Sequence, residues 1–197
     1  MKRYDCLKLL APMVDKHMFV VTSLSSNTAF WSSLRLEGPN FLGCNMGLCV
    51  PFALGLTAAF PNRKVIALDS DGSLMVDTSS LITVADVNPL NFVIIVFDNG
   101  SYARMGTTFT TRRTDLEKIA RGAGIDKTAT VRSEETFSAA VKQGLDTAGP
   151  HFIVAKVEPD RQRVKGDPHR TYGRAMRERF MDAVRHHPDY KGGKKGD

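Results

Sequence analysis

The stretch FVIIVF at residues 92–97 constrains the fold most, because six apolar residues follow one another without alternation. A strand with one face in water alternates apolar and polar side chains, whereas a strand covered on both faces does not. Strands of the second kind belong to parallel sheets with helices packed against both sides. Residues 92–97 therefore predict an α/β protein with a parallel sheet flanked by helices on both faces.

Further apolar runs supply the other strands of this sheet, and helical patterns separate them. The expected strands are residues 19–21, 65–68, 92–97, 128–131 and 152–157. The expected helices between and after them are residues 27–36, 48–60, 79–87, 115–123 and 134–148. In such alternating folds the carboxyl ends of the strands share one rim, and ligands bind there.

Length and charge divide the chain into a body and a tail. The 197 residues fit one domain at residues 1–158, followed by a linker, a helix and a basic disordered tail at residues 159–197. Residues 1–159 hold 16 Lys/Arg and 15 Asp/Glu, whereas residues 160–197 hold 11 and 6. The net positive charge thus belongs to the tail, so the body is not expected to bind nucleic acid.

The tail contains one more helical pattern, from Thr171 to His187. Met176, Phe180 and Val184 fall on one stripe of this helix. We interpret this segment as a solvated helix with a loose end rather than as an RNA-binding element. The alternative interpretation is that the stripe docks on a partner subunit.

Nothing in the sequence predicts export or membrane insertion. No window approaches the roughly 20 apolar residues of a membrane span, and residues 1–17 are too charged for a secretory leader. The three cysteines, Cys6, Cys44 and Cys49, have neither metal-ligand nor disulfide spacing. The prediction is a cytoplasmic protein with reduced thiols and no membrane partner.

Two strands of the expected sheet end in oxygen-bearing side chains next to glycine. Asp71 follows residues 65–68, and Asn99 follows residues 92–97. Carboxylate and amide oxygens suit Mg²⁺, which completes its shell with water and substrate phosphates. Gly72 and Ser73 open a segment whose main-chain N–H groups can meet a phosphate. The rim therefore predicts a metal site beside a phosphorylated ligand.

These residues resemble a known family. The stretch SDGSL, followed by DNGSY with 25 residues between Gly72 and Asp98, is similar to the diphosphate-binding signature of thiamine diphosphate enzymes. That signature begins with GDG and ends in a pair of asparagines. The stretches FLGCNMGLCVPFALGLTAAFPNRKVIALDSDGSL, DLEKIARGAGI and GPHFIVAKVEP extend the resemblance over residues 15–158. It implies the diphosphate-binding (PP) domain of the thiamine diphosphate-binding fold, with thiamine diphosphate and Mg²⁺ as cofactors.

The resemblance also implies roles for individual residues. The metal ligands would be the side chains of Asp71 and Asn99 and the carbonyl oxygen of Ser101. The diphosphate would be held by Gly72, Ser73, Ser25, Ser26 and Asn27. Met46 would bend the cofactor into its V shape, and the carbonyl of Cys44 would accept a hydrogen bond from its aminopyrimidine.

The chain departs from the family signature at two positions. Ser70 stands where the signature has its first glycine, which a negative φ would allow. Asp98 stands where the signature has its first asparagine, and it would add negative charge near the metal.

The family also uses a glutamate on a separate pyrimidine-binding domain, and this chain has room for one α/β domain. We therefore expect no catalytic residue in this chain and a pyrimidine-binding alpha subunit as partner, in an α2β2 heterotetramer. The stretch FDNGSYARMGTTFT resembles family members that decarboxylate sulfopyruvate, where this domain is a separate beta subunit, or phosphonopyruvate. The implied reaction converts a 2-oxo acid to an aldehyde. Arg104, Thr107 and Thr108 are the candidate substrate contacts.

Two other functions stay open at this point. The first is a carboligase half-subunit similar to acetolactate synthase. The second is a non-catalytic α/β module that binds a phosphate or a nucleotide. The sequence has neither a GxGxxG nor a GxxxxGK loop, which argues against the second.

Overall fold

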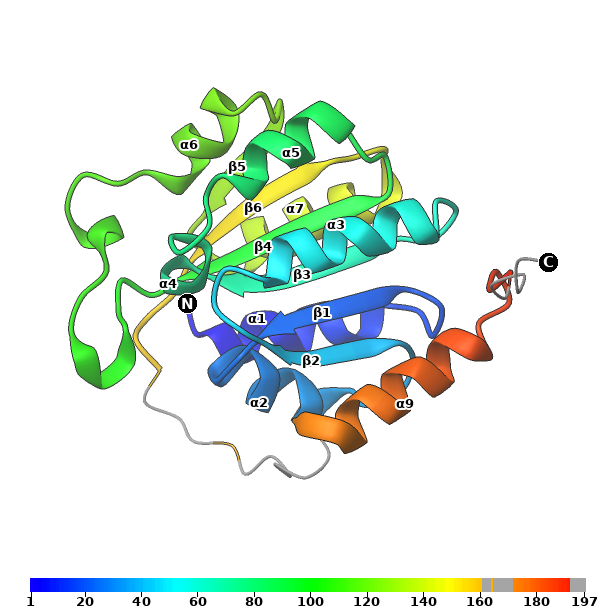
Figure 1. Cartoon of the computed structure of the whole chain (residues 1–197). Coiled ribbons are helices and arrows are strands. Elements are labelled where there is room, and N and C mark those ends of the chain that lie inside the picture. The colour runs from blue at the N-terminus through cyan, green and yellow to red at the C-terminus, as the bar shows by residue number, and fades with distance from the viewer. Residues whose placement is uncertain (161–163, 165–171, 192–197) are drawn as a thin grey trace.

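The computed structural model of the chain describes residues 1–160, 164 and 172–191 (Figure 1). Its described part contains one sheet whose strand order is β2-β1-β3-β4-β6-β5, and every pairing in it is parallel. The strands are β1 (Phe19–Ser23), β2 (Asn40–Cys44), β3 (Val65–Ser70), β4 (Phe92–Asp98), β5 (Lys127–Val131) and β6 (His151–Lys156). The parallel sheet predicted from the unbroken apolar run is confirmed.

Helices cover both faces of this sheet, as the buried strands require. Helices α3 and α5 lie on one face, and α1 and α7 lie on the other (Figure 1). The helices are α1 (Arg3–Leu10), α2 (Ser26–Leu34), α3 (Cys49–Ala59), α4 (Asp71–Leu74), α5 (Ser80–Val87), α6 (Leu116–Gly122), α7 (Glu134–Asp146) and α9 (Gly173–Arg185), with 3-10 turns at Ala11–Met13, Ala103–Met105 and Phe109–Thr111.

The pairing of the two central strands, β3 and β4, determines which residues meet at the rim. All seven residues of β4 are buried, because helices cover it on both sides. Strand β3 pairs with β4 from Val65 opposite Phe92 to Ser70 opposite Phe97. The residues that follow, Asp71 at the start of α4 and Asp98 at the end of β4, therefore lie side by side at the rim.

Helix α9 corrects one prediction. Met176, Phe180 and Val184 are buried against this chain itself. The ring of Phe180 packs edge-on against Phe41 of β2, with 5.3 Å between the ring centroids. The alternative interpretation, that this stripe docks on a partner subunit, was wrong, because the stripe covers the β2 side of its own domain. Thr171 and residues 192–197 lie outside the described part, so the expected start of the helix and the expected disordered end stay predictions.

None of the helices in the described ranges is long and apolar enough to cross a membrane. The three cysteines are free and buried, and the loss of hydration raises the pKa of the Cys44 thiol to about 11 and that of Cys6 to about 12. Their thiols are therefore protonated at neutral pH and act as small apolar side chains.

Candidate cofactor site

A cavity of about 530 Å³ opens at the carboxyl edge of the sheet, beside the ends of β1, β3 and β4. This volume falls within the range of roughly 300–1,000 Å³ that small-molecule sites occupy. Seven of the residues predicted to hold the cofactor and its metal line the cavity: Ser25, Ser26, Met46, Gly72, Ser73, Asn99 and Ser101. Loops from distant parts of the sequence thus meet at the predicted rim.

Asp71 lies between two residues that line this cavity and is 1% exposed. Its Oδ2 accepts a hydrogen bond of 2.6 Å from Thr108 and a longer one of 3.3 Å from Thr110. Its Oδ1 is buried without a hydrogen-bond partner among the described residues. Burial raises the pKa of Asp71, the Thr108 hydroxyl opposes this shift, and the charge of Asp98 adds to it. An orphaned carboxylate oxygen is costly to bury, and a bound cation would satisfy it.

Asn99 and Ser101 form a tight turn on the same wall of the cavity. The Oδ1 of Asn99 accepts a hydrogen bond of 3.0 Å from the main-chain N–H of Ser101. An amide oxygen has a second lone pair, so this turn fixes the side chain and leaves acceptor capacity for a metal. The donor set of Asp71, Asn99 and the Ser101 carbonyl, all oxygen, fits Mg²⁺ chemistry.

The loop after β4 contains a buried polar network that the sequence analysis missed. Asp98 forms an ion pair with Lys156, which lies opposite it on β6. Thr110 donates to Oδ1 of Asp98 at 2.7 Å and lies 3.3 Å from Oδ2 of Asp71. Lys156 therefore compensates for the aspartate that replaces the family's first asparagine. Asp98 and Lys156 are the last residues of β4 and β6, two neighbouring parallel strands, and this shared position was the signal that could have revealed the pair.

The turn after β3 is shaped for close approach by a ligand. Ser70 has φ −126° and ψ 158°, an extended conformation that any residue adopts, so its replacement of the family's glycine introduces no strain. A Cβ atom on Gly72 would lie 2.5 Å from the ring of Tyr102, so only glycine fits there. Ser73 is 2% exposed, and its Oγ accepts a hydrogen bond of 3.3 Å from the N–H of Gly47.

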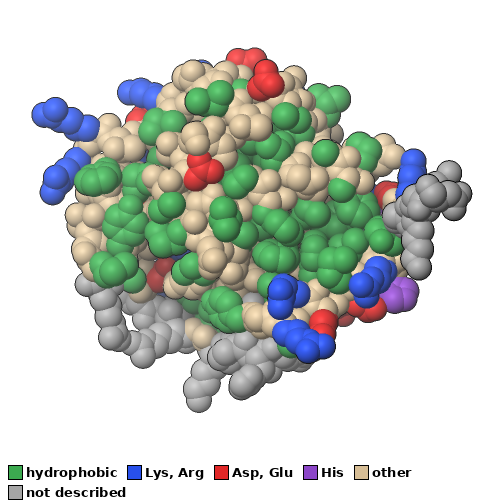
Figure 2. Space-filling view, in the orientation of Figure 1, with side chains coloured by type: hydrophobic (Ala, Val, Ile, Leu, Met, Phe, Trp, Pro, Cys, Tyr) green, Lys and Arg blue, Asp and Glu red, His purple; other side chains and the backbone are tan. Residues whose placement is uncertain are grey.

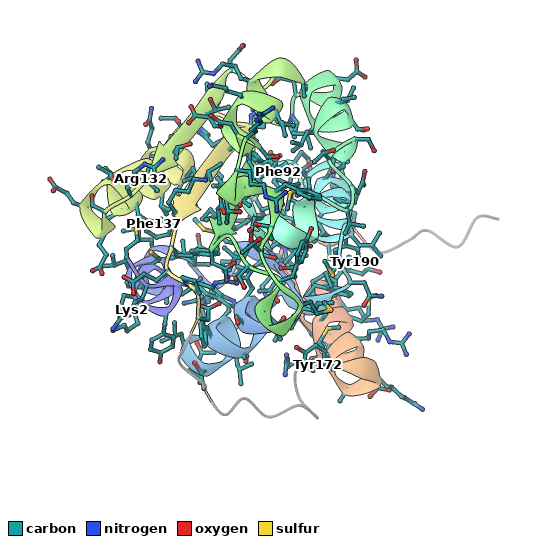
Figure 3. All side chains as sticks on the ribbon, turned by 90° about the vertical axis from the view of Figure 1, so that its left-hand side faces the viewer. Lys2, Phe92, Arg132, Phe137, Tyr172 and Tyr190 are labelled. Carbon is teal, nitrogen blue, oxygen red and sulfur yellow. The ribbon has the colours of Figure 1, made fainter. Side chains whose placement is uncertain are left out.

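Among the residues predicted to hold the cofactor, one that carries a side chain has a strained backbone, and it lies in the turn after β1. Ser25 has φ 73°, a left-handed value that is uncommon for a residue with a side chain. Its N–H donates a hydrogen bond of 3.2 Å to the hydroxyl of Tyr172, at the start of α9 (Figure 3). Strain of this kind costs about 1–3 kcal/mol and concentrates at ligand sites.

Two predicted contacts lie elsewhere. Asn27 is fully buried, where its Oδ1 accepts from Arg3 at 2.8 Å and its amide donates to Ser23 and to the carbonyl of Leu68. The side chain of Thr108 is 1% exposed and bonds to Asp71. In this structure Asn27 bonds within the turn after β1 and Thr108 bonds to a metal-ligand candidate, so the contacts predicted for them with cofactor and substrate stay predictions.

The remaining predicted residues surround the site without direct support for their roles. Cys44 is buried, and its carbonyl already accepts a hydrogen bond of 2.9 Å from Leu24. Thr107 is exposed and pairs with Ser101 in an isolated bridge. Arg104 belongs to the 3-10 turn Ala103–Met105, and its side chain is outside the described part. The assignments of Cys44, Thr107 and Arg104 stay predictions.

Fold and site together define a class: a parallel α/β domain with a small-molecule-sized cavity at the carboxyl edge of its sheet. Residues 29–155 match the family model of the thiamine pyrophosphate enzymes, C-terminal TPP binding domain. Because this match covers more than half of the chain, the chain belongs to that family.

Relatives span nearly the whole chain. The sulfopyruvate decarboxylase subunit beta of Methanocaldococcus jannaschii is 31% identical over 188 residues, which cover 93% of this chain and 97% of the relative. The phosphonopyruvate decarboxylase of Streptomyces viridochromogenes is 30% identical, over 77% of this chain but 38% of the relative.

A solved structure supports the fold. A Mycobacterium smegmatis protein assigned to the thiamin diphosphate-dependent enzymes superposes with a TM-score of 0.69 at 24% identity. The match covers 81% of this chain and 32% of that one.

Proposed function

We propose that this chain is the diphosphate-binding subunit of a two-subunit enzyme that uses thiamine diphosphate and Mg²⁺ to decarboxylate a 2-oxo acid to an aldehyde. The substrate class is sulfopyruvate- or phosphonopyruvate-like, as in the named relatives. The observation that carries the proposal is the orphaned Oδ1 of Asp71, buried beside a cavity in a domain of the TPP-binding family.

The residues of this chain divide the work of holding the cofactor. Asp71, Asn99 and the carbonyl of Ser101 would hold Mg²⁺, and the main chain at Gly72 and Ser73 would receive the diphosphate. When bound, thiamine diphosphate supplies the nucleophilic carbon and the electron sink that decarboxylation requires. The chain's own contribution is to orient the metal and the diphosphate and to keep water from the buried Asp71.

A partner subunit would supply the acid that this site lacks. Among the described residues that line the cavity there is one carboxylate, that of Asp160. It forms an ion pair with Arg3. No free acid of the described residues therefore lines the cavity beside the cofactor. A pyrimidine-binding subunit, in an α2β2 assembly, would contribute the activating glutamate.

The surface of α3 and α5 supports a partner of this kind. The sequence of α3, CVPFALGLTAA, is apolar almost all round, a composition typical of a helix that is buried on every side. Leu48, before α3, is 52% exposed, and Ile82 of α5 is 63% exposed. Figure 2 shows apolar side chains gathered over this face. A second chain would remove this surface from water.

Reconstitution tests the proposal. The chain is co-expressed with a pyrimidine-binding chain from the same source, and CO₂ release is measured with sulfopyruvate and with phosphonopyruvate. We expect activity from the pair in the presence of Mg²⁺ and thiamine diphosphate, and little from either chain alone. Full activity of the isolated chain would overturn the two-subunit proposal, and acetolactate formed from pyruvate would identify a carboligase instead.

A further inference from the structure

Arg3, the first residue of α1, is a buried cation in the wall of the cofactor cavity. It is 4% exposed, and it lines the cavity together with Ser25, Gly72 and Ser73. Desolvation of a guanidinium is expensive unless its donors are satisfied. Its position, far from these residues in sequence but adjacent in space, therefore requires an explanation.

The known partners of Arg3 leave donors unused. One terminal nitrogen, Nη1, donates to Asn27 at 2.8 Å, and Nη2 pairs with Asp160 at 3.1 Å. The guanidinium also lies over the ring of Phe97, 5.6 Å from its centroid. The Nε group is buried with no hydrogen-bond partner among the described residues. A guanidinium has five N–H donors, so this one retains capacity for an acceptor.

The orphaned donor of Arg3 has an orphaned acceptor nearby. Oδ1 of Asp71 is likewise buried without a partner among the described residues, as is Oδ2 of Asp69 within β3, and the charges of both act on Arg3 through space. Asp71 is the one of the two that lies between two residues lining the cavity, Ser70 and Gly72. A cation alone would satisfy Asp71 and leave Arg3 unsatisfied, whereas an anion alone would do the reverse. A metal-bound diphosphate satisfies both, because the metal meets the carboxylate and a phosphate oxygen meets the guanidinium.

We propose that Arg3 is a direct ligand of the cofactor's diphosphate, held in place by Asn27 and Asp160. This inference rests on the proposed function, since it assigns a further contact to the same ligand. It adds a charge-assisted hydrogen bond from the first helix to a cradle otherwise made of serine side chains and main-chain N–H groups.

A binding experiment separates this role from a merely structural one. Isothermal titration measures the affinity of the full chain, with its partner subunit, for Mg²⁺–thiamine diphosphate, for Mg²⁺–inorganic diphosphate and for thiamine. For Arg3→Met we expect diphosphate-containing ligands to bind roughly 10- to 100-fold more weakly, as for a lost hydrogen bond to a charged group, and thiamine to bind unchanged. Arg3→Lys should retain part of the affinity, since lysine keeps the positive charge but lacks the planar guanidinium that can donate two parallel hydrogen bonds.

Two further variants serve as controls. Lys2→Met removes one positive charge from the neighbouring residue, whose side chain is exposed at the start of α1 (Figure 3), and it should leave binding unchanged. Asp160→Asn breaks the ion pair of Arg3 but spares the guanidinium. If Arg3 only ties α1 to the segment after β6, Asp160→Asn should weaken binding as much as Arg3→Met does. If Arg3 binds phosphate, Asp160→Asn should weaken binding much less than Arg3→Met does, because the guanidinium remains and Asn27 still holds it.

The outcomes distinguish this inference from the proposed function. A wild-type protein that does not bind Mg²⁺–thiamine diphosphate would overturn both. A wild-type protein that binds, together with an Arg3→Met variant that binds equally well or loses thiamine to the same extent, would overturn only the role of Arg3. If Arg3→Met does not fold, as judged by circular dichroism, the comparison of Arg3→Lys with Asp160→Asn decides.

Discussion

The hydroxyl of Thr108 donates a 2.6 Å hydrogen bond to Oδ2 of Asp71, although 37 residues separate them in sequence. The other oxygen of the same carboxylate, Oδ1, is buried and has no partner among the described residues. The loop after β4 therefore fixes the orientation of a carboxylate at the end of β3. It leaves one oxygen for an incoming cation.

Replacing Thr108 with valine tests this orienting role. Valine keeps the shape of threonine but cannot donate to Oδ2, so the carboxylate loses its shortest hydrogen bond. Changes next to a metal ligand commonly cost about 10- to 100-fold in metal affinity. We expect Mg²⁺-dependent binding of thiamine diphosphate to weaken by about tenfold in a Mg²⁺ titration. Thr108→Ser should restore it, and Thr107→Val, at the exposed neighbouring position, should have no effect. Equal affinity for Thr108→Val and wild type would contradict the role.

The ion pair between Asp98 and Lys156 makes a prediction about stability. Asp98 is 3% exposed, so Lys156→Met would leave its carboxylate buried with only its hydrogen bonds to Thr110 and Gly100. Because Lys156 itself is 26% exposed and partly screened, we expect a loss of about 2 kcal/mol, below the figure for a fully buried pair. The double variant Asp98→Asn/Lys156→Met should recover most of this loss in urea denaturation. A double variant less stable than Lys156→Met alone would contradict this, because it would show that the unpaired Asp98 carboxylate is stabilised by Thr110 and Gly100.

The packing of α9 predicts a difference between two adjacent residues. Phe180 is 5% exposed and contacts Phe41, whereas Met181 is 41% exposed. Phe180→Ala should lower the free energy of unfolding by about 3 kcal/mol, as large-to-small changes in a core do. Met181→Ala should change it by less than about 0.5 kcal/mol. If neither variant changed thermal or urea stability, α9 would not be part of the folded domain in solution.

His151, the first residue of β6 and remote from the metal loop, predicts that the stability of the fold depends on pH. Burial lowers its pKa, and the nearby cations Lys127 and Lys64 lower it further, against the hydrogen bond to the Ala148 carbonyl. The unfolded chain therefore binds a proton at higher pH than the folded chain, so stability is lost as pH falls below about 6.5 towards the folded pKa. The slope cannot exceed about 1.4 kcal/mol per pH unit from one such group.

A matched variant isolates this contribution. His151→Gln cannot gain the proton, and it retains a side chain able to bond to Thr147 or Ala148. Urea denaturation between pH 7 and pH 5 should show wild type losing stability relative to His151→Gln as pH falls. If the stabilities of the two proteins changed in parallel with pH, His151 would not be the source of the pH dependence.

The sequence predicted five of the six strands and the rim, because these depend on local patterns, but it missed β2, Asn40–Cys44. The unbroken run of residues 92–97 indicates a doubly covered strand, and parallel neighbours must end at the same edge. Asp71 and Asn99 could thus be placed at one rim without any coordinates. Ser25, Gly72 and Ser73, which line the cavity beside them, follow from the same topology.

The contacts that tune the site could not be predicted in this way. Thr108, Thr110 and Arg3 reach Asp71 and its surroundings through loop conformation and helix packing, which no local periodicity encodes. The stripe of α9 was recognised as apolar, but an amphipathic pattern does not state which surface it covers. In the structure that surface belongs to the same chain.

Native mass spectrometry of the full chain with its partner subunit, in Mg²⁺ and thiamine diphosphate, tests the central claim most directly, with Asp71→Ala measured alongside. If Asp71 holds the metal and, through it, the diphosphate, the wild type should retain one thiamine diphosphate and one Mg²⁺ per diphosphate-binding chain, and Asp71→Ala should retain neither. A wild-type assembly that retains no cofactor, or an Asp71→Ala variant that retains both, would contradict it.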